Sequence, residues 1–243
     1  MPESLALTRL LNHLFGPLVA AVLQTVGIHP AHPAAPIDDT FALELLVACG
    51  LILFFLIVRL TLSVENPNPA QQIAEMIHEF VGNQAESVIG HGYERFQAYV
   101  TCVGLYIVIL NLLGLVPGIT TPTSQPVVPL GIAGLTFLYY NYQGVRAHGL
   151  GYLKQFAGPM WQISWLIFPI EIISHLARMM SLTIRLYANM LASDLLTLIA
   201  FSFLPFALPI LPLGLHFVVA LIQAYVFMLL SMIYLGMAVS HEH

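Results

Sequence analysis

The sequence predicts an all-α membrane protein, with about five membrane helices and an interfacial helix at the N-terminus. Hydrophobic residues make up 58% of the 243 residues and charged residues only 8%, whereas about 25% are charged in soluble proteins. No Asp, Glu, Lys or Arg occurs in the 50 residues 96–145 or in the 47 residues 195–241. Because about 20 apolar residues cross a bilayer, each run is long enough for two spans. So few charges exclude a soluble enzyme.

The N-terminal segment is residues 1–40, in which an apolar stretch over 4–28 is followed by a loop rich in Pro and His. The stretch has neither a basic start nor an obvious cleavage site with small residues, so it does not match a signal peptide. We expect an interfacial or docking helix here, with a short membrane span as the second interpretation.

The first membrane helix is predicted over 41–64, where Glu44 and Arg59 lie near the ends and direct their charges toward the interfaces. The composition then changes, because residues 65–95 contain five acidic side chains: Glu65, Glu75, Glu79, Glu86 and Glu94. This segment is predicted to be an aqueous connector that contains a helix, with Ile73, Ile77 and Phe80 near helical spacing.

The remaining residues, 96–243, are predicted to form one ion-translocating membrane domain. Its helices are expected over 96–116, 128–147, 160–203 and 212–240. The Pro, Gly and Thr content of residues 116–124 indicates a loop. Pro205, Pro209 and Pro212 are too many prolines for one continuous helix, so the second long run is also expected to divide.

The few basic residues give the orientation. Arg59, Arg95, Arg146 and Lys154 fall on one side of the membrane if the predicted helices alternate in direction. Because cytoplasmic loops carry an excess of Lys and Arg, that side is predicted to be cytoplasmic. The N-terminus is then outside, and the connector and the C-terminus are cytoplasmic.

Ionisable residues are concentrated in the long segment 161–205, which contains Glu171, His175, Arg178, Arg185 and Asp194. Ionisable groups at membrane depth are costly, so they pair with each other, face a protein interface or line a wet pathway. Two arginines and two carboxylates also allow a purely structural alternative, in which these charges only neutralise each other.

Helix geometry separates these residues into two faces. At about 100° per residue, one stripe holds Glu171, His175, Arg178, Arg185 and Asn189. Asp194 falls about 180° from Arg185. In a regular helix, Asp194 therefore cannot pair with Arg185, which needs a carboxylate from elsewhere.

The last predicted helix carries a second polar stripe, because His216 and Gln223 are seven residues apart. Histidine changes its charge near neutral pH and is suited to a proton relay with a buried carboxyl group such as that of Asp194. Arginine stays charged at any working pH. Arg185 is therefore expected to be a fixed barrier on a proton route rather than a proton carrier.

Three stretches closely resemble the a subunits of F-type ATP synthases. The first runs from Pro169-Ile170-Glu171 through Arg185-Leu186-Tyr187-Ala188-Asn189-Met190. The others are residues 223–235, Gln-Ala-Tyr-Val-Phe-Met-Leu-Leu-Ser-Met-Ile-Tyr-Leu, and residues 111–118, Asn-Leu-Leu-Gly-Leu-Val-Pro-Gly. They occur in the family order over about residues 92–243, whereas residues 1–90 match only in general layout.

This resemblance implies a non-catalytic stator subunit, bound to a rotating ring of c subunits and to the b-subunit stalk. The absence of a transit peptide indicates a bacterial plasma (inner) membrane. Its last two helices would form a long, strongly tilted hairpin against the ring. Arg185 occupies the position of the essential arginine that separates two proton half-channels. The outer half-channel would be lined by Asn189, Asp194, His216 and Gln223, and Glu171 would belong to the cytoplasmic one.

The sequence departs from the family at Asp194, where bacterial relatives often have Glu, and at Ala188, which replaces a frequent Gly.

Three other functions remain open on the residues alone. A proton-coupled secondary transporter would use the same charged residues, although no inverted repeat is evident. A haem protein would use His175 and His216 as axial ligands, and a structural subunit would need only neutralised charges. We expect no cofactor or metal, no nucleic-acid partner, since one Lys and six Arg make no basic surface, and no nucleotide binding, since no GxxxxGK[ST] phosphate loop occurs.

Overall fold

The computed structural model describes residues 5–25, 35–116, 119–149, 151, 164–203 and 210–239. In these residues the regular secondary structure is helical, which confirms the all-α prediction. The chain divides into two compact units, residues 1–54 and residues 55–243. The four polar residues 171, 185, 194 and 216 all lie in the second unit.

The N-terminal unit is built around α1 (Ala6–Thr25) and the beginning of α2 (Asp39–Leu60). The Asn12 side chain exchanges two hydrogen bonds of 3.0 Å with the backbone of Ile37. Asp39 Oδ1 accepts hydrogen bonds from the Leu5 amide and the Thr8 hydroxyl. Side chains of α1 and α2 thus hold α1 to the chain around the start of α2. In the described residues, α1 is not among the helices that are long and apolar enough to cross a membrane. Its assignment as an interfacial helix stays a prediction.

Among the described residues, four helices are long and apolar enough to cross a membrane: α2, α4 (Glu94–Leu113), residues Ile167–Phe203 of α7 (Ser164–Phe203), and α8 (Ile210–Val239). The helix expected over 128–147 is present as α5 (Val127–His148), which has the same length as α2. It is less hydropathic because its second half contains Tyr-Tyr-Asn-Tyr-Gln at residues 139–143. Its assignment as a fifth membrane span stays a prediction.

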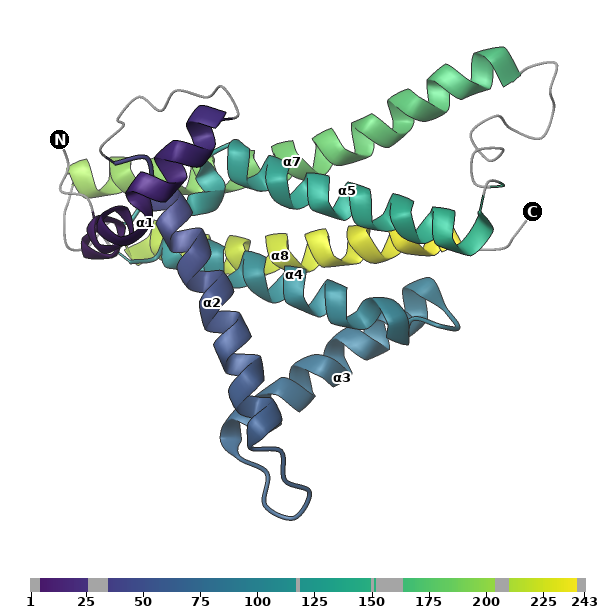
Figure 1. Cartoon of the computed structure of the whole chain (residues 1–243), viewed down its shortest axis with the longest axis horizontal. Helices are drawn as coiled ribbons and strands as arrows, with labels where there is room; N and C mark the ends of the chain where they lie inside the picture. The colour runs from purple at the N-terminus through teal and green to yellow at the C-terminus, as the bar shows by residue number, and fades with distance from the viewer. Residues whose placement is uncertain are drawn as a thin grey trace. The chain divides into compact units, whose positions relative to one another are not determined.

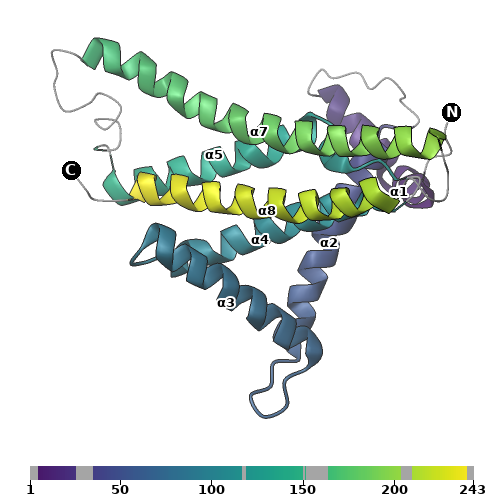
Figure 2. The same ribbon diagram turned by 180° about the vertical axis from the view of Figure 1, so that it is seen from behind.

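Within the second unit, α8 packs against α3 (Pro69–Ile89), α4, α5 and α7, and both views show it among these helices (Figures 1 and 2). Its buried side chains recur every three or four residues: Pro212, His216, Ala220, Gln223, Ala224, Phe227, Met228, Ser231, Met232, Leu235 and Ala238. Several of these residues are small. Small residues allow membrane helices to approach closely, where packing rather than hydrophobicity drives association. This periodicity makes α8 the central helix of the unit.

The connector contains the expected helix, α3, and one face of this helix is buried. Val81 and Ala85 enter a core cluster with residues of α4, α5 and α8. Ile73 and Phe80, which lie near helical spacing in the sequence, are about half exposed. Spacing alone identified an apolar stripe but not which side of it the neighbouring helices would cover.

The chain reverses between α3 and α4 at a short turn that requires glycine. Gly90 and Gly92 have φ values of 79° and 88°, a region that side chains with a Cβ rarely adopt. From this turn α3 and α4 diverge in both views (Figures 1 and 2). The turn places the end of α3 against Gly236 of α8.

The two C-terminal helices differ from the expected hairpin in one detail. Pro212 does not lie in the break but in the first turn of α8, where a missing N–H costs nothing because that group has no intrahelical partner. Pro205 and Pro209 lie outside the described residues. α7 has 40 residues and is about 60 Å long at 1.5 Å per residue.

Candidate functional site

Arg185 lies near the middle of α7 and is half-buried. Its guanidinium Nη2 donates a weak hydrogen bond of 3.5 Å to Ser181 Oγ, one turn earlier on the same helix. Among the residues that the structure describes, no carboxylate forms an ion pair with it. Neighbouring side chains of α7, including Ile184 and Asn189, are exposed. Arg185 therefore lies beside a face of α7 that the described residues leave uncovered.

Asp194 and His216 form a polar pair between α7 and α8. His216 Nδ1 lies 3.6 Å from Asp194 Oδ1, and His216 Nε2 lies 3.0 Å from the backbone oxygen of Asn111. A carbonyl oxygen only accepts hydrogen bonds, so Nε2 carries a proton. In neutral His216, Nδ1 is then free to take up a second proton beside the carboxylate. This arrangement suits two groups that share and transfer one proton.

The loop between α4 and α5 completes this cluster. Thr121, which precedes the short 3-10 helix η1 (Pro122–Ser124), donates a hydrogen bond of 2.7 Å to Asp194 Oδ1. Thr123 donates one of 2.6 Å to Asn111 Oδ1, and Thr121, Thr123 and Asn111 are all fully buried. The loop expected at 116–124 is therefore more than a connection, because it supplies two hydroxyl groups to the site.

Asp194 also lines a cavity of about 380 Å³ between the end of α4, the loop after it and α7. Gly114, Thr120, Ser124 and Thr197 contribute to its wall together with apolar side chains. The volume suffices for several water molecules, each of which occupies about 30 Å³ in the liquid. The carboxyl group thus lies where a wet passage can reach it.

Gly114 is necessary for the close packing around Asp194. A Cβ at this position would lie 1.8 Å from Thr121 Oγ1 and 2.9 Å from His216 Cε1. Its φ of −65° is accessible to any residue, so space rather than backbone conformation demands glycine.

We expect Gly114→Ala to move the Thr121 hydroxyl away from Asp194 and to cost about 1–3 kcal/mol through overpacking. Proton conduction and the thermal aggregation temperature of the purified complex should both fall. Gly134→Ala in α5 is the matched control, because nothing lies within 4 Å of its Cβ position. Equal behaviour of the two variants would contradict this view of Gly114.

Asn189 and Gln223 form a second contact between α7 and α8. Asn189 Nδ2 donates a hydrogen bond of 2.8 Å to Gln223 Oε1. Asn189 is one turn beyond Arg185, and Gln223 is two turns beyond His216. The amide pair therefore occupies the stretch between the arginine and the Asp194 cluster.

Glu171 belongs to a separate cluster on the other side of Arg185. Its Oε1 lies 3.3 Å from His175 Nε2 and 3.9 Å from Arg178 Nη2. The guanidinium of Arg178 also lies 5.6 Å from the centre of the Tyr234 ring of α8. Mutual neutralisation, the structural alternative, thus applies to Glu171 and Arg178 but leaves Arg185 without a carboxylate in the described part of the chain.

The structure brings the predicted site residues together in three groups: Asp194 with His216, Asn189 with Gln223, and Glu171 with His175 and Arg178. The two histidines lie in different groups, and both nitrogens of each ring contact protein groups. This arrangement does not support paired axial ligands to a haem. In the described residues no group of three or more His, Cys, Asp or Glu side chains is placed to hold a metal ion.

Sequence reasoning missed the roles of Asn111, Gly114 and Thr121. Asn111 is one of several amides in a long run without charges, and the threonines were treated as loop residues. The buried amide was the available signal, since a polar side chain in a membrane helix needs a partner. Its partners on α8 and in the loop are not predictable from spacing within α4.

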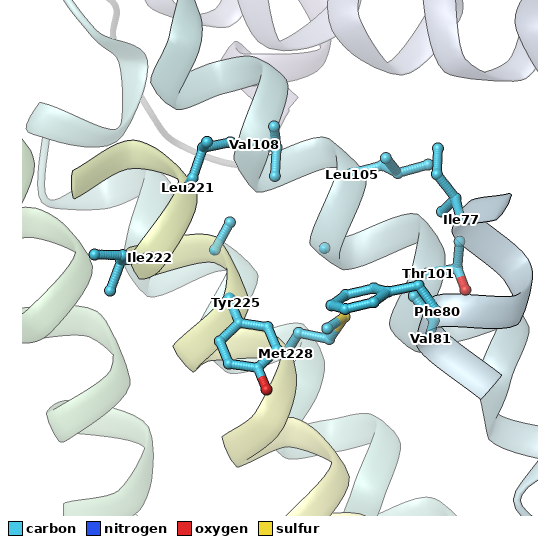
Figure 3. A pocket seen from close by; sticks show the side chains of 12 residues that line it. Ile77, Phe80, Val81, Thr101, Leu105, Val108, Leu221, Ile222, Tyr225 and Met228 are labelled. Atoms are coloured by element: carbon cyan, nitrogen blue, oxygen red, sulfur yellow. The ribbon is translucent and has the colours of Figure 1, made fainter. Parts of the chain in front are cut away.

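A second cavity, of about 430 Å³, lies between α3, α4 and α8 (Figure 3). Its lining is apolar and includes Phe80, Leu105, Tyr225 and Met228. The side-chain hydroxyl of Thr101 is buried here and has no hydrogen-bond partner among the residues that the structure describes. Because no carboxyl group or histidine lines it, this cavity is distinct from the ionisable clusters.

Comparison with known proteins identifies the family. Residues 42–236 match the family model described as ATP synthase A chain. The chain is 47% identical over 244 residues to ATP synthase subunit a of Koribacter versatilis, with 100% of both chains covered. It is 42% identical over 224 residues to that of Solibacter usitatus, covering 92% of this chain and 95% of the relative. For the protein of Aquifex aeolicus the identity is 38% over 185 residues, with coverage of 72% and 86%.

These matches cover both the polar clusters and most of the membrane helices, and they decide against a secondary transporter. The three stretches that carried the resemblance all fall largely within the matched range. The chain belongs to the ATP synthase A chain family, and it is a multi-pass membrane protein, the proton-conducting subunit of a bacterial F0 sector that couples proton flow to ATP synthesis.

Proposed function

We propose that this chain provides two proton half-channels that meet a rotating ring of c subunits at Arg185. The observation that carries the proposal is that Arg185 has no carboxylate partner in the described residues while two clusters of ionisable groups flank it. At 1.5 Å per residue along α7, Asp194 is about 14 Å from Arg185 and Glu171 about 21 Å in the other direction. The arginine thus interrupts what would otherwise be one polar route.

Protons enter from the outside through the Asp194 cavity, and His216, Asn189 and Gln223 line the onward path. There each proton neutralises a carboxylate of the ring, which then turns into lipid as a neutral acid. After nearly a full rotation the acid reaches the route that contains Glu171 and releases its proton toward the cytoplasm.

Arg185 keeps these two routes apart. Its charge is permanent, so it cannot pass a proton along. It attracts the ring carboxylate that has just lost its proton. A proton that crosses the membrane down a potential of 100 mV releases about 2.3 kcal/mol of free energy. A fixed charge between the routes prevents this energy from being lost in a direct leak.

The length of α7 supports a strongly tilted hairpin. Its length of about 60 Å is twice the hydrocarbon core of about 30 Å. A helix longer than the core adapts by tilting. Only 22% of the most apolar stretch of α7 is buried among the described residues, against 44% of that of α8. α7 therefore has the larger surface available for the ring and for lipid.

The remaining partners and the topology complete the proposal. The b-subunit stalk holds this subunit against rotation. The chain lies in the bacterial plasma (inner) membrane with its N-terminus outside and its C-terminus and the connector 65–95 in the cytoplasm. Residues 1–40 form the interfacial segment, 41–64 the first membrane helix, and 96–243 the ion-translocating domain.

Disulfide crosslinking tests the contact with the ring. Cys49 and Cys102 are exposed and are first replaced by Ser. Ile184→Cys, at a position 55% exposed and adjacent to Arg185, should then crosslink to a cysteine placed beside the membrane carboxylate of a c subunit. Leu186→Cys is the control, because Leu186 is fully buried within this chain. Without a crosslink from position 184, or with equal crosslinking from position 186, the proposed contact would be wrong.

A further inference from the structure

His175 connects Glu171 to a second helix. The residue is buried, and its two ring nitrogens contact groups on different helices. Nε2 lies 3.3 Å from Glu171 Oε1 on α7. Nδ1 lies 3.1 Å from the hydroxyl oxygen of Tyr140 on α5. The imidazole therefore bridges a carboxyl group that is partly exposed and a hydroxyl group inside the protein.

Packing holds the Tyr140 hydroxyl in place. Tyr140 is 2% exposed and belongs to the main core cluster. Its ring lies 5.4 Å from that of Phe137 and 5.9 Å from that of Tyr234. A side chain confined in this way offers a hydrogen-bonding group at a defined position.

The chemistry of the two contacts sets the tautomer of His175. An ionised carboxylate only accepts hydrogen bonds, so Nε2 donates to Glu171 Oε1. In the neutral ring Nδ1 is then the acceptor, and the Tyr140 hydroxyl donates to it. Arg178 approaches the same oxygen, Oε1, at 3.9 Å. With Oε1 turned toward His175 and Arg178, Oε2 is the oxygen left to exchange protons.

We propose that His175 is a positioning residue for proton release, which orients Glu171 through Nε2–H and is itself oriented by Tyr140. This inference rests on the proposed role of Glu171. In the described part of the chain, the charged and titratable groups around it include Arg178 on α7, Tyr140 on α5 and Tyr234 on α8. The contact with His175 fixes the orientation of the Glu171 carboxyl group, from which the proton is released toward the cytoplasm.

The test compares His175→Leu with His175→Gln in the assembled F0 complex in vesicles stripped of the catalytic sector. The measured quantity is passive proton conduction as a function of the pH on the Glu171 side. His175→Leu should lower conduction about tenfold and shift its half-maximal pH upward by about one unit, because a donor to the carboxylate is lost. His175→Gln should retain most of the conduction, since its amide donates like Nε2–H but cannot carry a proton.

Tyr140→Phe removes only the hydroxyl and keeps the ring, which separates positioning from a failure to fold. It should shift the pH profile in the same direction by a smaller amount. Both effects should vanish in a Glu171→Gln background, because residues acting through one group are not additive. The amount of assembled complex in each preparation normalises the conduction.

The outcomes separate this inference from the proposed function. If Glu171→Gln impairs conduction but the Leu and Phe variants leave its pH profile unmoved, His175 has no positioning role and the proposed half-channels stand. Loss of conduction in His175→Gln equal to that in His175→Leu would also overturn the positioning role, because the ring itself would then carry protons. If Glu171→Gln conducts normally, the assignment of Glu171 to the pathway is wrong.

Discussion

Replacing Arg185 with alanine is expected to reduce proton-driven ATP synthesis about a thousandfold. A guanidinium and a carboxylate about 4 Å apart attract each other by about 4 kcal/mol at an effective dielectric constant of 20, and each 1.4 kcal/mol is a factor of ten. Without this attraction the ring carboxylate has no fixed charge to hold it in its ionised form. The measurement is ATP synthesis by reconstituted vesicles under an imposed proton gradient.

The same variant should also leak. With the barrier gone, protons pass between the Asp194 and Glu171 routes without turning the ring, so the gradient decays while synthesis stays low. Arg185→Lys tests the need for a permanent charge, since a desolvated lysine can lose its proton; it should synthesise poorly as well. Arg146→Ala, at an exposed position in the last turn of α5, is the control and should behave like the unmodified protein. Normal synthesis by Arg185→Ala would refute the barrier.

Asp194→Asn is expected to lower passive proton conduction about a hundredfold, within the range that positioned proton-transfer groups contribute. The amide keeps the size of the side chain, and its oxygen can still accept the hydrogen bond from Thr121. It cannot take up or release a proton at working pH. Conduction is measured with a pH-sensitive dye in vesicles that contain the F0 sector alone.

Two further variants test whether the loss of proton conduction is due to the missing carboxyl group. Asp194→Glu restores a carboxyl group, and the adjacent cavity of about 380 Å³ has room for the added methylene, so conduction should largely return. Glu86→Gln makes the same chemical change at an exposed position of α3 and should have no effect. If Asp194→Asn conducts as well as the unmodified chain, protons reach the ring by another route.

Much of the site followed from local periodicity. The spacing of Asp194 and Arg185 predicted that they face different directions, and Asp194 indeed contacts His216 and Thr121 instead of the arginine. The regular rise and turn of an α-helix make such angles a property of the sequence alone. Periodicity also placed His216 and Gln223 on one face of α8, and both are buried there.

Contacts between distant segments were beyond this reasoning. Thr121 and Asp194 are 73 residues apart, and Asn111 and His216 are 105 apart. The Tyr140 contact with His175 likewise joins α5 to α7. No rule of helical spacing relates residues on separate helices, whose rotation and depth are set by packing.

The lack of charge along the chain, the helical spacing of its few polar residues and the family motifs were sufficient to establish a helical membrane protein of this family and to single out Arg185. Helix packing alone determined that a loop hydroxyl contacts Asp194, that Gly114 leaves space for it and that the Tyr140 hydroxyl contacts His175. The physical reason is that polarity and helical period are local properties of a chain. Close packing and hydrogen bonding between helices depend on the simultaneous position of all of them.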